Sequence, residues 1–301
     1  MGMLAAIDMG SNSFRTQIGE YVNGTIRVIR TAREPNRLAA GLDKNNNLTK
    51  AAIKAGLDAL RGIREVLALY PLDAVRAVAT STLRVARNAP DFLVQAEDVL
   101  GYPIEVISGQ EEGRLIYLGV DKLLLRPEER RLVIDIGGGS TEIIRGYGAA
   151  IDHVESFHVG TVAQSLAFFP DGHITAERFE IAVLAASRYF EDIGAKYHCR
   201  HWQTAYGSSG TMRTIAEILA DNAIGDGRMT EHNLQQLCAV MTGMKKVSKL
   251  GRLGVRPERA ASIVGGLSIL LALMRDLEIP VMHPVMAGLR MGIMWDMCEK
   301  G

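Results

Sequence analysis

Cysteine is scarce in this sequence, and its distribution excludes a disulfide framework. The three cysteines, Cys199, Cys238 and Cys298, lie far apart and form no Cys-x-x-Cys pair. Disulfide scaffolds and cysteine zinc sites both need paired thiols, so we expect a reducing compartment and place the protein in the cytoplasm. The segment 198–201, His-Cys-Arg-His, comes nearest to a metal site. It lacks a second ligand pair and is more typical of a helix end.

An excess of either charge is also absent. The chain carries 34 basic and 34 acidic residues among 301. The chain therefore lacks the overall positive charge that is typical of nucleic-acid-binding proteins and of proteins held at an anionic membrane surface. We therefore expect neither nucleic acid nor a membrane as a partner, and any site for a polyanion must be local.

Long hydrophobic runs are missing as well. The most apolar segment, 263–274, is interrupted by Gly265, Gly266 and Ser268. It stays short of the roughly 18 apolar residues that indicate a membrane span, so we expect a buried helix. The N-terminus shows no basic segment followed by an apolar stretch and a small-residue cleavage site, and we expect no targeting sequence.

An internal repeat is the most informative feature that is present. Residues 4–13 align with residues 132–140, and each copy is a short apolar run closed by Asp-x-Gly and small polar residues. This pattern predicts a buried strand that enters a tight turn. Two further strands are expected after each copy, at 14–20 and 25–31 in the first and at 141–145 and 151–157 in the second.

Both halves continue on the same plan. In the first, apolar residues recur with a helical period from 49 to 70, and a strand, a helix, a strand and a helix follow. In the second, helices are expected from about 175, with strands at 203–206 and 280–283 and a last helix. The charged, proline-containing segment 125–131 separates the two halves, as a domain boundary should.

The duplicated βββαβαβα unit predicts an α/β protein with the actin-like ATPase (ribonuclease H-like) fold. By analogy with actin, hexokinase and heat-shock ATPases, we expect two domains with an interdomain cleft. Domain I is predicted at 1–124 and domain II, with helical insertions, at 125–301. The C-terminal helix at about 288–300 could pack back on domain I.

Three clusters of small residues are candidate phosphate loops. Glycine permits a concave turn whose N–H groups converge on phosphate oxygens, and hydroxyl and amide side chains add donors. The third cluster also opens a helix, whose N-terminus suits an anion. The alternative is an ordinary turn in each case, although two matching Asp-x-Gly copies favour a site. The residues are Ser11, Asn12, Ser13, Gly137, Gly138, Gly139, Ser140, Thr141, Gly207, Ser208, Ser209, Gly210 and Thr211.

Carboxylates near these loops suggest a metal and a base. Asp8 and Asp135, at the strand ends, could hold Mg²⁺ or another divalent cation, which prefers carboxylate and phosphate oxygens. Ser108 and Glu111 have capping-box spacing, which explains Glu111 structurally. Glu112 lies about 100° further round the helix and is left to face the cleft, where it could deprotonate an attacking water. A solvated helix glutamate is the alternative.

Basic residues gather at two places. Arg84 follows a predicted strand and could meet a phosphate, although a surface arginine is an equal alternative. The segment 245–259 carries six basic residues against one acid, Glu258. A polyphosphate or nucleotide tail could run over it, and a solvated helix-loop-helix face is the other reading.

Six motifs, in order and spacing, resemble those of the exopolyphosphatase and guanosine pentaphosphate phosphohydrolase (Ppx/GppA) family, in a short two-domain form. The pair Ser-Gly-Gln-Glu-Glu at 108–112 and Asp-Ile-Gly-Gly-Gly-Ser-Thr-Glu at 135–142 is the most specific. The other motifs are Asp-Met-Gly-Ser-Asn-Ser-Phe at 8–14, Ala-Thr-Ser-Thr-Leu-Arg at 79–84, Gly-Ser-Ser-Gly-Thr at 207–211 and Gly-Leu-Arg at 288–290.

The resemblance implies that Glu112 is the catalytic glutamate, Asp135 the metal- and water-positioning aspartate, and Arg84 a phosphate contact. Including Glu142, which closes the second motif, we expect the metal at Asp8, Asp135 and Glu142. The family usually continues Gly-Leu-Arg with Glu-Gly, whereas Met291 stands here, so any role of that glutamate is in doubt. Longer members carry a C-terminal helical domain that this chain does not show, which suggests shorter substrates or lower processivity. Dimers are common in the family, and we expect a homodimer.

We therefore expect an enzyme that releases terminal orthophosphate from polyphosphate, with Glu112 as general base and Mg²⁺ at the phosphate loops. Guanosine pentaphosphate, a stringent-response nucleotide, is the alternative substrate. Two further alternatives are a sugar or acetate-type kinase on the same fold and a phosphate or alarmone sensor that binds without turnover.

Overall fold

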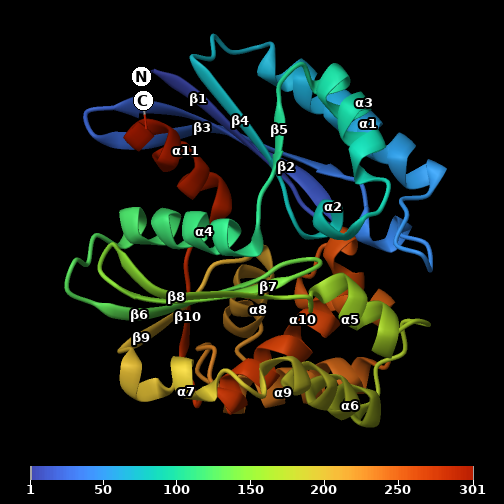
Figure 1. Cartoon of the computed structure of the whole chain (residues 1–301). Helices are drawn as coiled ribbons and strands as arrows, with labels where there is room; N and C mark the ends of the chain where they lie inside the picture. The colour runs from blue at the N-terminus through green and yellow to red at the C-terminus, as the bar shows by residue number, and fades with distance from the viewer. Residues whose placement is uncertain (1, 301) are drawn as a thin grey trace. The chain divides into compact units, whose positions relative to one another are not determined.

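The protein consists of two compact units, and each is described by itself. The structure, a computed structural model, describes residues 2–300. Unit 1 comprises Met1–Leu124 and Ala287–Gly301, and unit 2 comprises Leu125–Met286 (Figure 1). The last helix of the chain, for which the sequence left two placements open, is part of unit 1.

Unit 1 is built on a mixed five-stranded sheet in the order β3-β2-β1-β4-β5 (Figure 1). The first three strands form an antiparallel meander, and β4 and β5 extend it in parallel from β1. Residues 4–7 of β1 are fully buried, as expected of a central strand covered on both faces. The strands are β1 Met3–Met9, β2 Ser13–Val22, β3 Thr25–Pro35, β4 Ala74–Ala79 and β5 Ile104–Val106.

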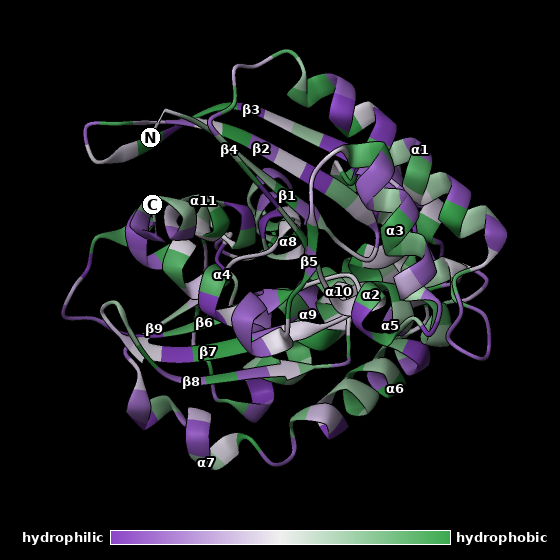
Figure 2. Ribbon diagram, turned by 45° about the horizontal axis from the view of Figure 1, so that its top comes forward, coloured by the Kyte–Doolittle hydropathy of each residue, from purple (hydrophilic) through white to green (hydrophobic). Residues whose placement is uncertain are grey.

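Two amphipathic helices and a close helix pair cover this sheet. The side chain of Thr49 accepts a hydrogen bond from the N–H of Ala52 and so starts α1. Purple and green residues alternate along α1, as expected of a helix with one buried face (Figure 2). The helices of unit 1 are α1 Lys50–Leu67, α2 Ser81–Val85, α3 Ala89–Leu100, α4 Gly109–Leu124 and α11 Leu289–Lys300, with the 3₁₀ turn Ala39–Gly41.

Helices α4 and α11 approach each other closely because glycines lie at their crossing. A Cβ atom on Gly292 would collide with the carbonyl oxygen of Leu115, and one on Gly119 would lie 2.5 Å from the carbonyl oxygen of Gly288. Only glycine permits this backbone approach. The Gly292 that follows Met291 therefore has a packing role in unit 1.

Unit 2 repeats the sheet of unit 1 strand for strand. Its order is β10-β9-β6-β7-β8, with the same antiparallel meander and the same two parallel extensions from its first strand. The duplicated α/β actin-like fold predicted from the internal repeat is confirmed. The strands are β6 Arg130–Ile136, β7 Thr141–Tyr147, β8 Ala150–Phe157, β9 Thr204–Gly207 and β10 Met282–Pro284.

Helix α10, Pro257–Asp276, forms the centre of unit 2. It is long and apolar enough by composition to cross a membrane, but 67% of that stretch is buried inside the protein. The expected buried helix at 263–274 is therefore confirmed as a core helix. The other elements are α5 Thr161–Phe168, α6 Ala176–Ser187, α7 Gly194–Tyr197, α8 Gly210–Asp221 and α9 Glu231–Met244, with 3₁₀ turns Arg188–Phe190, Cys199–His201 and Val247–Leu253.

Two short helices were not anticipated, and both lie next to a candidate site. Helix α2 contains Arg84, and α5 begins directly after the meander of unit 2. The buried residues of α5 are Thr161, Gln164 and Ser165, whereas Leu166 is 54% exposed. A helix that buries its polar face gives no apolar period, and the sequence pattern therefore missed it.

Candidate functional site

The turn of unit 1 is held by its carbonyl groups. The N–H groups of Asn36 and Arg37 donate to the carbonyl oxygen of Asn12, and that of Ala39 donates to the carbonyl oxygen of Ser11. The Thr82 hydroxyl, on α2, donates to the Ser11 hydroxyl at 2.8 Å. The structure thus brings together the first phosphate-loop candidate and the motif that contains Arg84.

Asp8 lies at the end of β1 among cations. Burial raises the pKa of its carboxyl, while Arg290 and, to a smaller degree, Arg15 lower it. The Nη1 atom of Arg290 lies 3.6 Å from Asp8 Oδ2, and Arg15 is the cross-strand neighbour of Asp8 on β2. Asp8 therefore has positive partners within unit 1.

Glu112 and Arg84 form a buried ion pair. Arg84 Nη1 donates to Glu112 Oε2 at 2.6 Å and to the carbonyl oxygen of Ile107 at 3.2 Å. Glu112 is only 8% exposed, so the alternative of a solvated helix glutamate is wrong. Arg84 is 13% exposed at its side chain, which also rules out a plain surface arginine. A carboxylate that accepts a short hydrogen bond from an arginine has a fixed orientation.

The neighbouring Glu111 is explained by local contacts. The Ser108 hydroxyl accepts a hydrogen bond from the Glu111 N–H at 3.1 Å, which is one half of the predicted capping box. The Glu111 carboxylate instead contacts the Arg114 guanidinium at 2.7 and 2.8 Å. This hydrogen bonding holds the pKa of Glu111 below its usual value. Two adjacent glutamates thus have different surroundings, one paired locally and one buried against α2.

The turn of unit 2 is likewise held by its carbonyl groups, here by a helix. The N–H groups of Thr161 and Val162, at the start of α5, donate to the carbonyl oxygens of Gly137 and Gly138. Within residues 2–300, no hydrogen-bond acceptor is found for the N–H groups of Gly138, Gly139 and Ser140. The turn thus offers donors for an anion, as predicted for a phosphate loop.

Gly160 is a site residue that the sequence analysis missed. A Cβ atom here would lie 2.5 Å from the Gly139 nitrogen and 2.6 Å from the Gly138 carbonyl oxygen. Both neighbours are backbone atoms of the loop, so only glycine fits at the start of α5. A single glycine before an unrecognised helix carried no signal in the sequence.

Asp135 and Glu142 lie opposite each other on β6 and β7. Directly opposed residues of an antiparallel pair project from the same face of the sheet. Asp135 accepts a hydrogen bond from the Ser208 hydroxyl at 3.1 Å, and Glu142 accepts one from the Ser156 hydroxyl at 2.8 Å. The structure therefore brings together two predicted metal ligands and the third small-residue cluster.

That third cluster joins β9 to α8 as expected. Ser209 caps the helix by accepting from the N–H of Met212, and the Thr211 hydroxyl donates to the carbonyl oxygen of Ile136. The turns after β6 and β9 are thereby tied together. Arg259, from the basic segment 245–259, donates to the carbonyl oxygen of Gly210 at 2.7 Å.

The remaining basic residues of that segment are exposed. They lie on the end of α9, the turn Val247–Leu253 and the start of α10. This is the helix-loop-helix face of the sequence analysis, and its exposure leaves the binding alternative open. The exposed residues are Lys245, Lys246, Lys249, Arg252 and Arg256.

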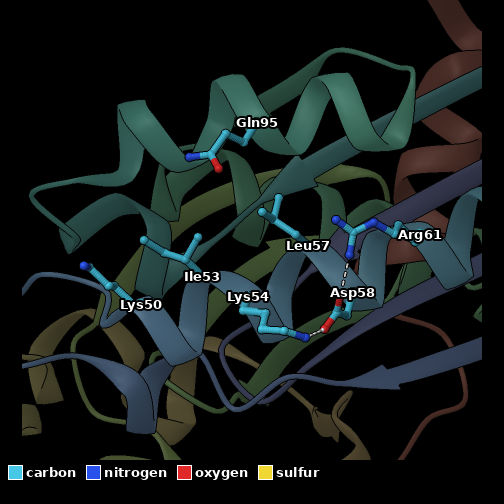
Figure 3. Close-up of a pocket in the computed structure, with 7 residues that line it drawn as sticks. All are labelled: Lys50, Ile53, Lys54, Leu57, Asp58, Arg61 and Gln95. Atoms are coloured by element: carbon cyan, nitrogen blue, oxygen red, sulfur yellow. Dashed lines mark hydrogen bonds and ion pairs between the residues drawn. The ribbon is translucent and has the colours of Figure 1, made fainter.

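A surface groove in unit 1 contains none of the predicted site residues. It lies between α1 and α3 (Figure 3). Asp58 is paired with Lys54 at 2.6 Å and also with Arg61, and Lys50 adds a third basic side chain, so the groove keeps an excess of positive charge. Its lining residues are Lys50, Ile53, Lys54, Leu57, Asp58, Arg61 and Gln95.

The fold and these sites define a class of protein: two α/β units of the actin-like fold, with buried carboxylates beside turns of small residues. The chain belongs to the Ppx/GppA phosphatase family, whose model matches residues 17–301. It is therefore a phosphatase, a hydrolase acting on phosphoanhydrides.

Individual relatives agree with this assignment. The chain is 40% identical over 295 residues to a Haemophilus influenzae protein that carries the name "Putative exopolyphosphatase", covering 98% of this chain and 91% of that one. It is similar to the Aquifex aeolicus PPX-GPPA enzyme, with 26% identity, a TM-score of 0.78 and coverage of 98% and 99%. An exopolyphosphatase from Cytophaga hutchinsonii shares the fold at 22% identity, with a TM-score of 0.84 and coverage of 99% and 98%.

Proposed function

We propose that this phosphatase is an exopolyphosphatase in which Glu112 is the general base. The observation that carries the proposal is the buried Glu112–Arg84 pair, at 2.6 Å, on two helices that each follow a strand of the unit 1 sheet. A general base must be oriented toward its water, and the hydrogen bond from Arg84 fixes the orientation of Glu112. The name of the Haemophilus influenzae relative supports polyphosphate as the substrate class.

Glu112 and Arg84 would share the work at the terminal phosphate. Glu112 would orient a water molecule and accept its proton as the oxygen attacks phosphorus. Arg84 would contact the phosphate oxygens, on which negative charge is spread in the transition state. Its guanidinium has five N–H donors, so it can bind phosphate and still orient Glu112.

The turns of unit 2 would hold the phosphate chain through backbone donors. The N–H groups of 138–140 and the N-terminus of α8 at Gly210 suit phosphate oxygens without requiring net positive charge on the surface. This agrees with a chain whose basic and acidic residues balance.

Asp135 and Glu142 fit a magnesium ion. Both are oxygen ligands, both project from the same face of one strand pair, and each is oriented by a serine hydroxyl. When bound, Mg²⁺ would neutralise charge on the phosphate chain. Asp8 has Arg290 beside it, so we propose that it has a smaller part in holding the metal.

The test is phosphate release by the wild type, Glu112→Gln and the matched control Glu111→Gln. Substrates are short polyphosphate, long polyphosphate, guanosine pentaphosphate and ATP, each with Mg²⁺ or EDTA. We expect Mg²⁺-dependent release from polyphosphate, about 10²–10⁴-fold slower in Glu112→Gln and little changed in Glu111→Gln. Circular dichroism and thermal unfolding would show that both variants fold.

Two results would contradict the proposal. An unaltered rate in Glu112→Gln would exclude this residue as the base. Phosphate release from guanosine pentaphosphate alone would mean that this nucleotide, and not polyphosphate, is the substrate. Binding of any of the compounds without phosphate release would favour a sensor that binds without turnover.

A further inference from the structure

A histidine, a cysteine and a glutamate meet in unit 2 away from the candidate site. The Sγ atom of Cys199 lies 3.4 Å from His198 Nδ1 and 3.5 Å from Glu278 Oε2. The ligand atoms of all three residues lie within 4.8 Å of one another. The sequence interpretation of 198–201 was right about the helix end, since α7 stops at Tyr197. It could not see Glu278, which joins the cluster from far along the chain.

The two separations from the sulfur match those of ligands around one tetrahedral metal ion. Zn–S bonds of about 2.3 Å and Zn–N or Zn–O bonds of about 2.0 Å place neighbouring ligand atoms about 3.5 Å apart. The two distances from the Cys199 sulfur, 3.4 and 3.5 Å, have this value. The sulfur therefore already lies at ligand distance from both neighbours, and the His198 ring has to turn to bind an ion.

The backbone at Glu278 gives a second and independent indication. This residue has φ +50°, in the left-handed region that residues other than glycine and asparagine rarely adopt. It stands just beyond the C-terminus of α10, where the N–H of Ile279 donates to the carbonyl oxygen of Met274 in a Schellman arrangement. Glycine is the usual residue at this position.

Glu278 also places a carboxylate beside the C-terminus of a helix. The C-terminus of a helix carries partial negative charge, which repels a carboxylate. Among the described residues, no lysine or arginine forms an ion pair with Glu278 within 4.0 Å, and its hydrogen-bond contact is the Cys199 thiol. A bound cation would offset both the repulsion and the backbone strain.

We propose that His198, Cys199 and Glu278 bind one Zn²⁺ ion, with water as the fourth ligand. Thiolate and imidazole favour zinc over Mg²⁺, which prefers oxygen ligands alone. On binding, the Cys199 thiol loses its proton to solvent and the sulfur becomes a thiolate ligand. The His198 Nδ1 lone pair turns from the Arg200 N–H, at 3.2 Å and exposed, to the metal.

The topology separates this site from the phosphate turns of unit 2. Strands β9 and β10 run parallel to β6, and the candidate phosphate turns follow the ends of β6 and β9. His198 and Cys199 precede the start of β9, and Glu278 precedes the start of β10. The zinc site therefore lies at the opposite end of these parallel strands from the phosphate turns. An ion there would connect the segment before β9 to the end of α10.

The arrangement does not suit cysteine catalysis. In a nucleophilic cysteine site the acidic group orients the histidine, which in turn activates the thiol. Here both the imidazole and the carboxylate contact the sulfur, so the three residues form a cluster around the thiol and not a relay.

The experiment is a Zn²⁺ titration of the full-length protein freed of metal, in excess Mg²⁺, against a chromophoric chelator. The variants are Cys199→Ser, with Cys298→Ser as the control thiol of unit 1, and Glu278→Gly. Cobalt substitution provides the spectroscopic readout, because a thiolate ligand gives a sulfur-to-cobalt charge-transfer band. Thermal unfolding with and without Zn²⁺ completes the set.

We expect one Zn²⁺ per chain and the charge-transfer band in the wild type and in Cys298→Ser. Cys199→Ser should lose the band and bind Zn²⁺ at least about tenfold more weakly. Glu278→Gly should also bind at least tenfold more weakly, yet unfold at a higher temperature than the metal-free wild type, because glycine relieves the positive φ. Absence of stoichiometric binding, or a Cys199→Ser variant that keeps the affinity and the band, would overturn the proposal.

Discussion

The two Asp-x-Gly turns have the same backbone plan, but the residue that lies across from the aspartate differs in charge. Each follows the central strand of an equivalent sheet, and each is held through its carbonyl oxygens by the segment after the third strand. In unit 1 the residue across from the aspartate is Arg15, and in unit 2 it is Glu142. The first aspartate thus faces cations, and the second faces another carboxylate.

This difference gives the two halves different chemical capacities. Two carboxylates that project from one face are the kind of oxygen ligands that Mg²⁺ prefers, and we therefore propose the turn of unit 2 as its place. The turn of unit 1 is neutralised by its own arginines, Arg290 above all. A duplicated fold therefore supplies two similar loops whose roles are set by a few side chains.

The largest effect is expected when the aspartates of the two turns are replaced one at a time. We expect Asp135→Asn to lower Mg²⁺-dependent phosphate release by at least about 10²-fold and to raise the Mg²⁺ concentration for half-maximal rate. Asp8→Asn should lower the rate by about tenfold and raise the half-maximal Mg²⁺ concentration less than Asp135→Asn does. Steady-state rates over a Mg²⁺ series measure both quantities.

Glu142→Gln serves as the companion of Asp135→Asn and should shift the Mg²⁺ dependence in the same direction. Equal Mg²⁺ shifts in the Asp8 and Asp135 variants would show that the two turns are electrostatically equivalent. The comparison drawn from Arg15 and Glu142 would then fail.

The next test breaks the support of the unit 2 loop. In Gly160→Ala the new methyl group meets the backbone of Gly138 and Gly139, which has no flexible side chain to move aside. We expect about 3 kcal/mol of destabilisation and a raised KM, because the loop must shift away from α5. Chemical denaturation and steady-state kinetics measure the two effects.

A matched control exists on α9. Gly243 has open space where its Cβ would lie, so Gly243→Ala should stabilise the protein by about 0.5–1 kcal/mol through helix propensity alone. If Gly160→Ala behaved like Gly243→Ala, the contact between α5 and the loop would not position the turn.

The sequence alone predicted those features of the two turns that depend on local pattern. The strands β1 and β6 and the turns after them follow from short apolar runs closed by Asp-x-Gly, a signal that each segment carries by itself. Glu112 was separated from Glu111 because Ser108 accounts locally for the first turn of α4. The capping box predicted a Glu111 carboxylate that bonds back to the start of the helix, but this carboxylate contacts Arg114. The prediction for the Glu111 side chain was therefore incomplete.

The electrostatic difference and the helix α5 could not be found in this way. That Arg15 faces Asp8 follows from strand register, and that Arg290 reaches Asp8 requires the packing of α11, the last helix of the chain, into unit 1. Helix α5 packs through polar contacts, since Ser165 accepts the N–H of Gly265 and Gln164 donates to the carbonyl oxygen of Ala182. Contacts between distant segments have no counterpart in local periodicity.

Unit 1 also differs from unit 2 in being completed by the end of the chain, and Asp296 holds that end in place. Asp296, on α11, contacts Arg76 at 2.6 Å, Arg114 at 2.7 Å and Lys300 at 2.9 Å. Burial raises the pKa of Asp296, but hydrogen bonds from Lys300 and Arg114 outweigh it and hold the pKa below its usual value. We expect Asp296→Asn to destabilise the protein by about 2 kcal/mol at neutral pH.

The pH dependence gives this prediction its sign. A carboxyl group with a lowered pKa in the folded state contributes stability above its unfolded pKa of about 3.9, and this contribution is lost as pH falls through the folded value. The gap in melting temperature between wild type and Asp296→Asn should therefore be full at neutral pH and close only below about pH 4. A gap that closed near pH 6 would exclude Asp296 as its source.

The smallest expected effect concerns Arg15, the residue that most directly distinguishes the two turns. Arg15 lowers the pKa of Asp8 less than Arg290 does, while burial raises it. In Arg15→Gln the pKa of Asp8 should rise further, so the charged carboxylate costs the folded state more at neutral pH, by about 0.5 kcal/mol or less.

Both variants should be less stable than the wild type at neutral pH, but the pKa shifts behind the two effects are opposite, since the pKa of Asp8 is raised and that of Asp296 is lowered. A carboxyl group with a raised folded pKa destabilises the protein at neutral pH, and the penalty is relieved as pH falls through that raised value toward the unfolded pKa of about 3.9. The deficit of Arg15→Gln should therefore shrink before the acid limit that governs Asp296 is reached, as thermal unfolding at closely spaced pH values would show. A deficit that stayed constant with pH would mean that Arg15 stabilises the protein through packing on β2. The charge of the residue across from Asp8 would then explain less of the functional difference between the two turns.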